Sequence, residues 1–296
     1  MNLNIQKSFA GDIGDRGKLY LVGTPIGNLE DMTYRAVRIL REVKWIAAED
    51  TRQTRKLLTH FEIDTRLVSY HEHNKQNSGP ELIRLLQGGD DVALVSDAGL
   101  PAICDPGADL VREAIAAGIA VVPIPGANAA LSALIVSGLP TDRFVFVGFP
   151  PRDAKPMSEE LARWKREAAT VIGYESPYRI VKTLTRIAEV LGEGRQVCLV
   201  RELTKKYEEA IRGTAAELLQ YLQEHPPQGE YCFVVEGGSA SGSEADADEQ
   251  WWSALTPEAH VAAYEERGLA HKEALRQAAS DRGLPKRELY NLLHQS

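Results

Sequence analysis

The feature that most restricts the fold is a regular alternation of short apolar runs with longer stretches of helical pattern. Between residues 19 and 124 the apolar runs are LYLVG, WIAAED, RLVSY, VALVS and AVVPI. Strands that alternate with crossover helices pair in parallel, because each crossover returns the chain to the same end of the sheet. We therefore expect an α/β fold with a mainly parallel sheet, and helices that start near Thr33, Thr51 and Pro80.

A second set of strands and helices begins near Asp142. It opens with the run FVFVGF, and a polar, proline-rich loop then leads to a helix over 158–168. After the last apolar run, EYCFVVEGG, a Gly, Ser and acidic stretch has the composition of a flexible linker. The expected organisation is a disordered or extended N-terminus (1–17), two α/β domains (18–140 and 141–238), a linker (239–250) and a helix-turn-helix-like tail (251–296).

Composition excludes several classes of protein. The three cysteines are odd in number, lie far apart and form no CxxC pair, so neither a disulfide framework nor a zinc knuckle is indicated. Residues 1–17 lack the apolar core of a signal peptide. The net charge of −8 argues against broad affinity for nucleic acid, although a local basic patch would escape this average. We expect a cytoplasmic protein.

A charge-free stretch lies between Glu113 and Asp142 and has the length of a membrane span. Pro123, Pro125 and Gly126 interrupt it, and a break exposed to lipid would leave backbone groups without hydrogen bonds. A helix end, a strand, a turn and a second helix fit the stretch better. We therefore expect no membrane segment.

Glycine-rich turns follow three of the expected strands, at 23–27, 97–101 and 125–128. Ligands of parallel α/β sheets bind outside the carboxyl ends of the strands, where such turns meet. The chain contains no P-loop motif, and Gly23-x-x-x-Gly27 is not a dinucleotide fingerprint. Asp97 would repel a phosphate but suits a ribose hydroxyl, an ammonium or a sulfonium. S-adenosylmethionine (SAM) carries all three groups.

The aspartates also have a purely structural interpretation. Asp and Asn side chains cap turns and helix starts by accepting backbone N–H groups. Asp105 precedes Pro106 at an expected helix start, so we expect it to act as a cap. For Asp97 we expect a ligand-binding role.

Several motifs together resemble one known family. In chain order they are LYLVGTPIGNLEDMTYRAV, AEDTRQT, SYHEHN, SDAGLPAICDPG, IPGANAALSAL, SGLPTDRF, YESPYR, RELTKKYEE and GEYCFVVEG. These resemble the ribosomal RNA small subunit methyltransferase I family of the tetrapyrrole methylase superfamily. The resemblance runs from about Lys18 to Gly238, and ALRQAASDRGLPKRELYNLL resembles the family's helix-turn-helix tail.

The resemblance implies two α/β domains of tetrapyrrole methylase type, with SAM in the cleft between them and a small helical tail. The implied activity is methylation of the ribose 2′-oxygen of a decoding-region cytidine in 16S rRNA of the small ribosomal subunit, by a homodimer. The implied cofactor contacts are Pro25 in the first turn, Asp97 and Gly99 in the second, Ala127, Asn128 and Ala129 in the third, and Tyr174 from the second domain. The family usually has Thr at Leu100, Ser at Cys104 and Pro at Ala127.

Methyl transfer to a hydroxyl gains from a positioned base, because the hydroxyl is a weak acid. Glu49, Asp50 and Glu175 stand at strand ends and are the candidates, with Glu49 and Glu175 preferred. Each could instead cap a turn or pair with an arginine. In SYHEHN, His71, Glu72 and His73 are metal-ligand types, but successive strand residues face opposite ways, so we expect no metal.

Basic residues suggest two places where RNA phosphates could bind. Arg52 and Arg55 lie one helical turn apart, although a solvated helix face explains them equally well. From Arg267 onward, six basic residues stand against three acidic ones. The helix-turn-helix pattern there can bind nucleic acid, or it can simply pack as an appendage. If this pattern binds nucleic acid, the expected RNA contacts are Lys272, Arg276, Lys286 and Arg287.

Two other functions fit the same fold. One is a SAM-dependent C-methyltransferase of a porphyrinoid, because fold does not fix substrate. The other is a non-catalytic ribosome-binding protein, which would have no affinity for SAM.

Overall fold

The computed structural model describes Gln6, residues 16–238, Trp252 and residues 255–293. The chain divides into two compact units, residues 1–237 and 238–296. Most of the N-terminal segment 1–17 and the whole expected linker 239–250 lie outside the described residues. Within the described part, no helix is both long and apolar enough to cross a membrane.

The first sheet is entirely parallel, and the prediction was a mainly parallel one. Its strands are β1 (Lys18–Val22), β2 (Trp45–Ala48), β3 (Arg66–Ser69), β4 (Val92–Val95) and β5 (Ala120–Ile124), in the order β3-β2-β4-β1-β5. Every residue of β4 is buried, as expected for a strand covered on both faces. The chain thus places the carboxyl ends of all five strands along one edge of the sheet.

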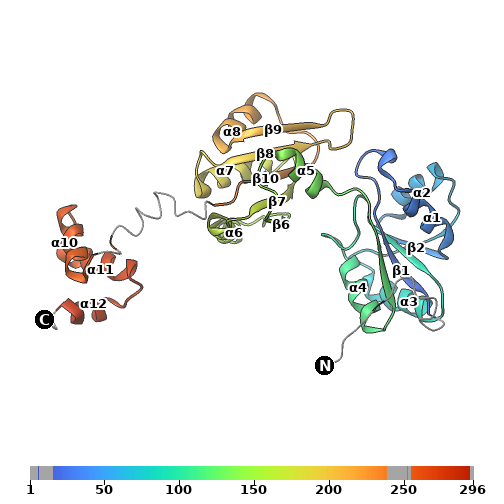
Figure 1. Ribbon diagram of the computed structural model, residues 1–296, viewed down its shortest axis with the longest axis horizontal. Helices are drawn as coiled ribbons and strands as arrows, with labels where there is room; N and C mark the ends of the chain where they lie inside the picture. The colour runs from blue at the N-terminus through green and yellow to red at the C-terminus, as the bar shows by residue number, and fades with distance from the viewer. Residues whose placement is uncertain (1–5, 7–15, 239–251, 253–254, 294–296) are drawn as a thin grey trace. The chain divides into compact units, whose positions relative to one another are not determined.

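Helices cover both faces of this sheet (Figure 1). A short 3-10 helix, η1 (Leu29–Asp31), leads from β1 towards α1 (Tyr34–Glu42), which packs with α2 (Thr51–His60) in a core on one face. On the other face α3 (Lys75–Gln87) and α4 (Gly107–Ala116) pack in a second core. Thr33 caps α1 by accepting the N–H of Ala36 at 3.1 Å, as its position predicts.

The prediction that a helix starts at Pro80 is wrong. The helix α3 starts five residues earlier, and Pro80 lies inside it. Asn74 fixes the earlier start, because its side chain accepts the N–H of His71 at 2.8 Å and donates to the carbonyl of Ser69 at 3.0 Å. These local bonds outweigh the one backbone hydrogen bond that a proline removes.

The second sheet is mixed. Its strands are β6 (Phe144–Gly148), β7 (Thr170–Glu175), β8 (Gln196–Arg201), β9 (Glu209–Thr214) and β10 (Tyr231–Val235), in the order β6-β7-β10-β8-β9. Only β6 and β7 pair in parallel. Sequence patterning missed β9, which carries charges and a glycine and forms the edge of the sheet.

Four helices pack on this sheet. One face carries α6 (Ala154–Arg166), α7 (Ile180–Leu191) and α8 (Ala215–Glu224) around a shared core. The helix α6 starts four residues before the predicted 158, because Pro156 falls in its first turn, where the backbone N–H has no partner to lose. The other face carries α5 (Ala129–Ser137), which packs on β7, β8 and β10. The domain limits stay a prediction, and this packing favours a boundary before α5.

The C-terminal unit is a small helical core. It contains α10 (Pro257–Glu266), α11 (His271–Asp281) and α12 (Lys286–Leu293). Val261, Leu275, Ala278 and Leu289 are buried together at its centre. The helix, DRGLPK turn and helix that the sequence predicts after His271 are therefore present, preceded by a further helix.

Candidate functional site

Three turns at the carboxyl edge of the first sheet are locked against one another. The backbone N–H of Thr24 donates to the carbonyl of Gly99 at 2.9 Å, and the N–H of Gly99 donates back to Thr24 at 3.1 Å. A Cβ atom placed on Gly23 would lie 2.8 Å from the Cα of Gly126, so the first and third turns touch backbone to backbone. Gly99 has a φ of +80°, which favours glycine. The turns form one rigid cradle.

A cavity of about 430 Å³ opens on this cradle. Such a volume is typical of sites for small-molecule cofactors. On the side of the first sheet, Ile26 and Gly99 line the cavity beside the acidic residues Glu49 and Asp97. The N-terminal end of α5 also reaches it through Asn128, which caps that helix by accepting the N–H of Leu131 at 2.9 Å.

The opposite wall comes from the second sheet. Tyr174 lines the cavity with Phe149, and the two ring centroids lie 5.6 Å apart. Burial, as the largest cause, raises the pKa of Tyr174 to about 12, so its hydroxyl stays neutral at physiological pH. Tyr231 and Cys232 of β10 complete this more apolar side. The cavity therefore has a side with clustered carboxylates, called here the acidic wall, and a side with aromatic rings, called the aromatic wall, which Glu175, Glu202 and Glu230 also line.

Three carboxylates gather on the acidic wall. Burial raises the pKa of Glu49, and the neighbouring charges of Asp97 and Asp105 raise it further, while His71 opposes them. A carboxylate with a raised pKa holds a proton more readily than one in water. Asp97 is exposed to the cavity and accepts the N–H of Asp50 at 3.0 Å.

Asp105 caps the start of α4, as predicted. One carboxylate oxygen accepts the N–H of Ala102 at 2.9 Å and that of Gly107 at 2.7 Å. The second oxygen is buried and has no hydrogen-bond partner among the described residues. The preceding loop is strained, because Ala102 and Cys104 both adopt positive φ angles without being glycine.

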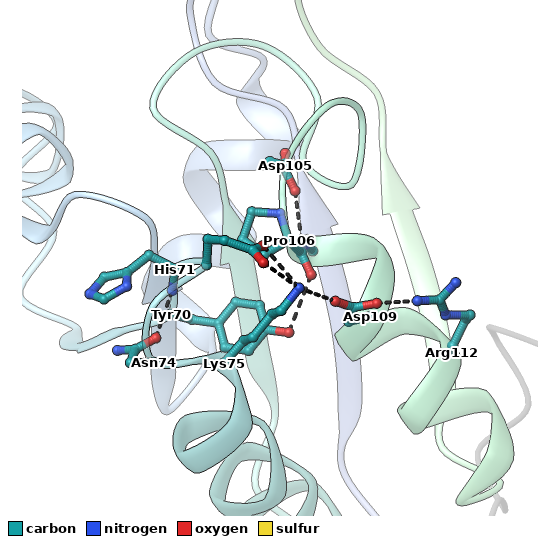
Figure 2. A network of polar contacts seen from close by, with 10 residues as sticks. Tyr70, His71, Asn74, Lys75, Asp105, Pro106, Asp109 and Arg112 are labelled. Atoms are coloured by element: carbon teal, nitrogen blue, oxygen red, sulfur yellow. Dashed lines mark hydrogen bonds and ion pairs between the residues drawn. The ribbon is translucent and has the colours of Figure 1, made fainter.

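A polar network fixes the loop after β3 against the start of α4 (Figure 2). The ammonium of Lys75 contacts Glu72 and Asp109, each at 2.8 Å, and Asp109 also bonds Arg112. These carboxylates raise the pKa of Lys75, with the bond to Asp109 as the largest cause. The hydroxyl of Tyr70 donates to the carbonyl of Pro106 at 3.2 Å. The network therefore holds the start of α4, which Asp105 caps, against the loop after β3.

Glu72 is thus engaged by a lysine, and the rings of His71 and His73 lie 6.0 Å apart. Within the described ranges, no group of three or more His, Cys, Asp or Glu side chains is arranged to hold a metal ion.

Glu175 is almost completely buried, with 1% of its side chain exposed. One of its oxygens accepts the hydroxyl of Thr183 at 2.7 Å and lies 3.4 Å from the guanidinium of Arg179. The other oxygen accepts the N–H of Ser176 at 2.9 Å. Arg179 also donates to the carbonyls of Pro150 and Pro151. Both oxygens of Glu175 therefore tie together the loops that carry the aromatic wall.

Comparison with known proteins assigns the family. The model of the Tetrapyrrole (Corrin/Porphyrin) Methylases matches residues 18–219. The chain is 55% identical over 281 residues to Ribosomal RNA small subunit methyltransferase I of Halalkalibacterium halodurans, covering 95% of this chain and 96% of that protein. It is 52% identical to the Bacillus subtilis protein of the same name, covering 99% of both. The chain belongs to the ribosomal RNA small subunit methyltransferase I family.

Solved structures agree with the family's fold. Uroporphyrin-III-C-methyltransferase of Thermus thermophilus is 22% identical with a TM-score of 0.53, and the match covers 78% of this chain and 98% of that one. A diphthine synthase is 15% identical with a TM-score of 0.58, over 75% and 90% of the two chains. At these identities the likeness extends to the fold alone, which is the two-sheet tetrapyrrole methylase fold with additional C-terminal helices.

The structure brings most of the expected site residues into one cavity. Asp97, Gly99, Asn128, Ala129 and Tyr174 all line it, as do both preferred base candidates. Pro25 and Ala127 are not among the described lining residues, but their chain neighbours Ile26 and Asn128 are. Of the three departures from the family's usual residues, Leu100 and Cys104 line the cavity.

Asp50 has the structural role that sequence left open. It caps α2, and its carboxylate is paired with the guanidinium of Arg52 at 2.8 Å. The hydrogen bonds from Arg52 lower the pKa of Asp50 to about 2. The side chain of Arg52 is nevertheless 88% exposed, and Arg55 is exposed on the same helix.

In the C-terminal unit, Lys272 and Arg276 are exposed on α11. The side chains of Lys286 and Arg287, the other two residues predicted to contact RNA, lie outside the described part of the structure.

Sequence reasoning missed the loop 202–208, which joins β8 to β9. Glu202, Leu203 and Lys205 of this loop line the cavity. From the sequence, this stretch was recognised only as part of the motif RELTKKYEE, and the strand β9 that would have marked it as a hairpin loop was itself missed.

Proposed function

We propose that this protein is a SAM-dependent rRNA methyltransferase that methylates the ribose 2′-hydroxyl of a decoding-region cytidine in 16S rRNA. The observation that carries the proposal is the cavity at the glycine cradle, with its acidic and aromatic walls, in a chain 55% identical to a Ribosomal RNA small subunit methyltransferase I.

The residues present suit SAM. The exposed carboxylate of Asp97 complements a ribose hydroxyl, an ammonium or a sulfonium, and the aromatic wall complements an adenine ring. The glycines of the cradle let the backbone approach a ligand closely, because a Cβ on Gly23 would strike Gly126. In this proposal Asp97, Gly99, Asn128, Ala129 and Tyr174 contact the cofactor, and Pro25 and Ala127 shape the turns.

Bound SAM supplies an activated methyl group, so the protein mainly orients the acceptor and takes its proton. The acceptor oxygen forms a bond to the methyl carbon as the carbon–sulfur bond breaks, and the hydroxyl proton passes to a carboxylate. Glu49 suits this role, because it lines the cavity, and burial together with neighbouring carboxylates raises its pKa and so its affinity for a proton.

Glu175 fits a base less well. Its two oxygens already accept three hydrogen-bond or ion-pair contacts, and its side chain is 1% exposed. In our proposal Glu175 holds Tyr174 and the α7 loop in place, and Glu49 alone takes the proton.

The proposed substrate is 16S rRNA within the small ribosomal subunit, and the proposed form is a cytoplasmic homodimer. Arg52, Arg55 and the C-terminal unit are proposed RNA contacts, because they present basic groups on exposed helix faces.

The decisive experiment measures transfer of a labelled methyl group from SAM to small ribosomal subunits, followed by mapping of ribose methylation. We expect one methylated cytidine in the decoding region, and a loss of roughly 10²–10⁴-fold in rate for Glu49→Gln. Labelling of a porphyrinoid in place of the subunit would identify a C-methyltransferase. An absence of SAM binding by calorimetry would leave a non-catalytic ribosome-binding protein.

A further inference from the structure

The β8–β9 loop 202–208 forms part of the rim of the cavity. Glu202, Leu203 and Lys205 line the cavity, while the residues that follow point away from the described core. The loop also touches the cradle of the first half, because a Cβ on Gly27 would lie 2.6 Å from Cγ of Lys205 and 3.0 Å from the carbonyl of Leu203. The loop therefore borders the cavity on the side of the second sheet and contacts the turn that follows β1.

This loop is held in a single shape by its own bonds. The N–H of Thr204 donates to the carboxylate of Glu208 at 2.6 Å, and the ammonium of Lys205 pairs with Glu202 at 3.0 Å. Backbone bonds join Lys205 to Glu202 and Glu208 to Lys205. Glu202 and Thr204 have positive φ angles, a strained conformation for residues other than glycine. These contacts have to compensate for the cost of the two positive φ angles.

The tip carries an exposed aromatic ring and a lysine whose ammonium lies over that ring. Tyr207 is 71% exposed, although large aromatic side chains are usually buried. The ammonium of Lys206 lies 5.4 Å from the centre of its ring. No carboxylate of the described residues forms an ion pair with Lys206. An aromatic face next to an unneutralised cation is the chemistry that binds a base by stacking and a phosphate by charge.

For its 2′-oxygen to lie inside the cavity, the target nucleotide has to leave the base stack or belong to RNA that is already single-stranded. Enzymes that act on nucleotides pay a few kcal/mol to unstack them, and an aromatic side chain at the entrance returns part of this cost.

We propose that Tyr207, assisted by Lys206, is the stacking platform for an unstacked base of the RNA substrate at the mouth of the cavity. The proposal rests on the RNA methyltransferase function proposed above and assigns a positioning role to a loop outside the cofactor-binding turns. Tyr207 contributes its ring face, and Lys206 contributes charge toward an adjacent phosphate.

The test compares Tyr207→Ala with Tyr207→Phe in methyl transfer to small ribosomal subunits at saturating SAM. Loss of one base–aromatic stack raises KM for the subunit roughly 5- to 150-fold, with a smaller change in kcat. Phenylalanine keeps the ring face, so its KM stays within about twofold of the parent. Tyr34→Ala is the matched control, because Tyr34 is 99% exposed on α1 and is not among the described residues that line the cavity.

Lys206→Gln tests the charge separately. Removing one phosphate contact lowers the slope of log affinity against log salt by about one. An unchanged slope would remove Lys206 from the proposal.

Three further readouts separate the alternatives. If the parent protein transfers no methyl group to subunits, the proposed function fails before the loop is tested. If the parent is active and Tyr207→Ala keeps the parental KM, or Tyr34→Ala raises KM equally, the stacking platform is refuted. A changed oligomeric state of Tyr207→Ala in sedimentation, or a weaker SAM affinity by calorimetry, would instead assign the ring to a contact between copies or to the cofactor site.

Discussion

A single carboxylate, Asp97, distinguishes this cradle from a phosphate-binding turn. It stands after β4 and faces the cavity, and one of its oxygens accepts the N–H of Asp50. Asp97→Asn keeps an oxygen for that bond, so we expect the fold to survive. Losing a charge-assisted hydrogen bond to SAM costs roughly 1.5–3 kcal/mol, which weakens the affinity about ten- to a hundred-fold. Calorimetry with SAM measures this loss of affinity.

The control for this change is Asp142→Asn, because Asp142 is exposed and is not among the described residues that line the cavity. Equal SAM affinity of the Asp97 variant and the parent would reduce Asp97 to a turn residue.

Glu49 makes the rate depend on pH in a defined direction. A base must be deprotonated to act, and burial and the charges of Asp97 and Asp105 raise its pKa. The rate at saturating substrates therefore rises with pH through a pKa higher than that of an ordinary glutamate. Asp105→Asn removes one negative neighbour but leaves an oxygen for the N–H groups of Ala102 and Gly107. We expect it to shift the acid limb of the pH–rate profile to lower pH.

A profile of Asp105→Asn that coincides with that of the parent would show that Glu49 is not the titrating base. A shift to higher pH would contradict the electrostatic argument itself.

At the scale of elements, the contact between the β1 and β5 turns sets the shape of the site. A Cβ on Gly126 would lie 2.9 Å from the Cα of Gly23, so the backbone of one of the two turns would have to shift. We expect Gly126→Ala to cost about 1–3 kcal/mol of folding free energy and to weaken SAM binding. Thermal unfolding and calorimetry measure the two effects. Gly194→Ala is the matched control, because nothing lies within 4 Å of an added Cβ there.

The elements that sequence predicted well are those governed by local rules. The helix α2 spans Thr51–His60 as predicted, and Thr33 caps α1, because caps and apolar periodicity act over a few residues. The start residues of α3 and α6, near Pro80 and Pro156, were predicted wrongly because they do not follow from such local rules. Pro156 lies in the first turn of α6, where it removes no helical hydrogen bond, whereas Pro80 lies inside α3 and other contacts offset its cost. No local pattern reveals either.

The residues of the site also fall into those that a general rule predicts and those that it does not. The rule that ligands bind at the carboxyl ends of parallel strands placed Asp97 and Asn128 correctly, because it depends only on strand direction. The wall contributed by the loop 202–208 was not predictable. Its position depends on the antiparallel pairing of β8 with β9 and on the packing of Lys205 against Gly27, more than 170 residues away in sequence.

At the scale of the whole molecule, the C-terminal residues differ from the rest of the chain in charge, and the C-terminal unit has a core of its own. The net charge is −8, yet residues from Arg267 onward hold six basic and three acidic side chains. The C-terminal unit also has its own core around Leu275 and its own polar bonds, such as that of Tyr264 to Asp281 at 2.6 Å. The two α/β sheets keep their cores without it. Acidic residues before Arg267, such as Glu258, Glu265 and Glu266 of α10, offset this charge over the unit as a whole, so the basic part is confined to the last two helices and their turn. A unit with an independent core and a basic C-terminal part is suited to binding an anionic partner.

Removal of that unit therefore tests whether it docks RNA. A shortened protein that ends at Gly238 should fold and bind SAM with parental affinity, because every residue that lines the cavity precedes residue 233. Its affinity for the small ribosomal subunit should fall, and its binding should depend less steeply on salt, because fewer lysines and arginines displace phosphate counterions. Binding titrations at several salt concentrations measure both. If affinity and slope match those of the full chain, the C-terminal unit does not dock RNA, and Arg52 and Arg55 become the leading candidates for that contact.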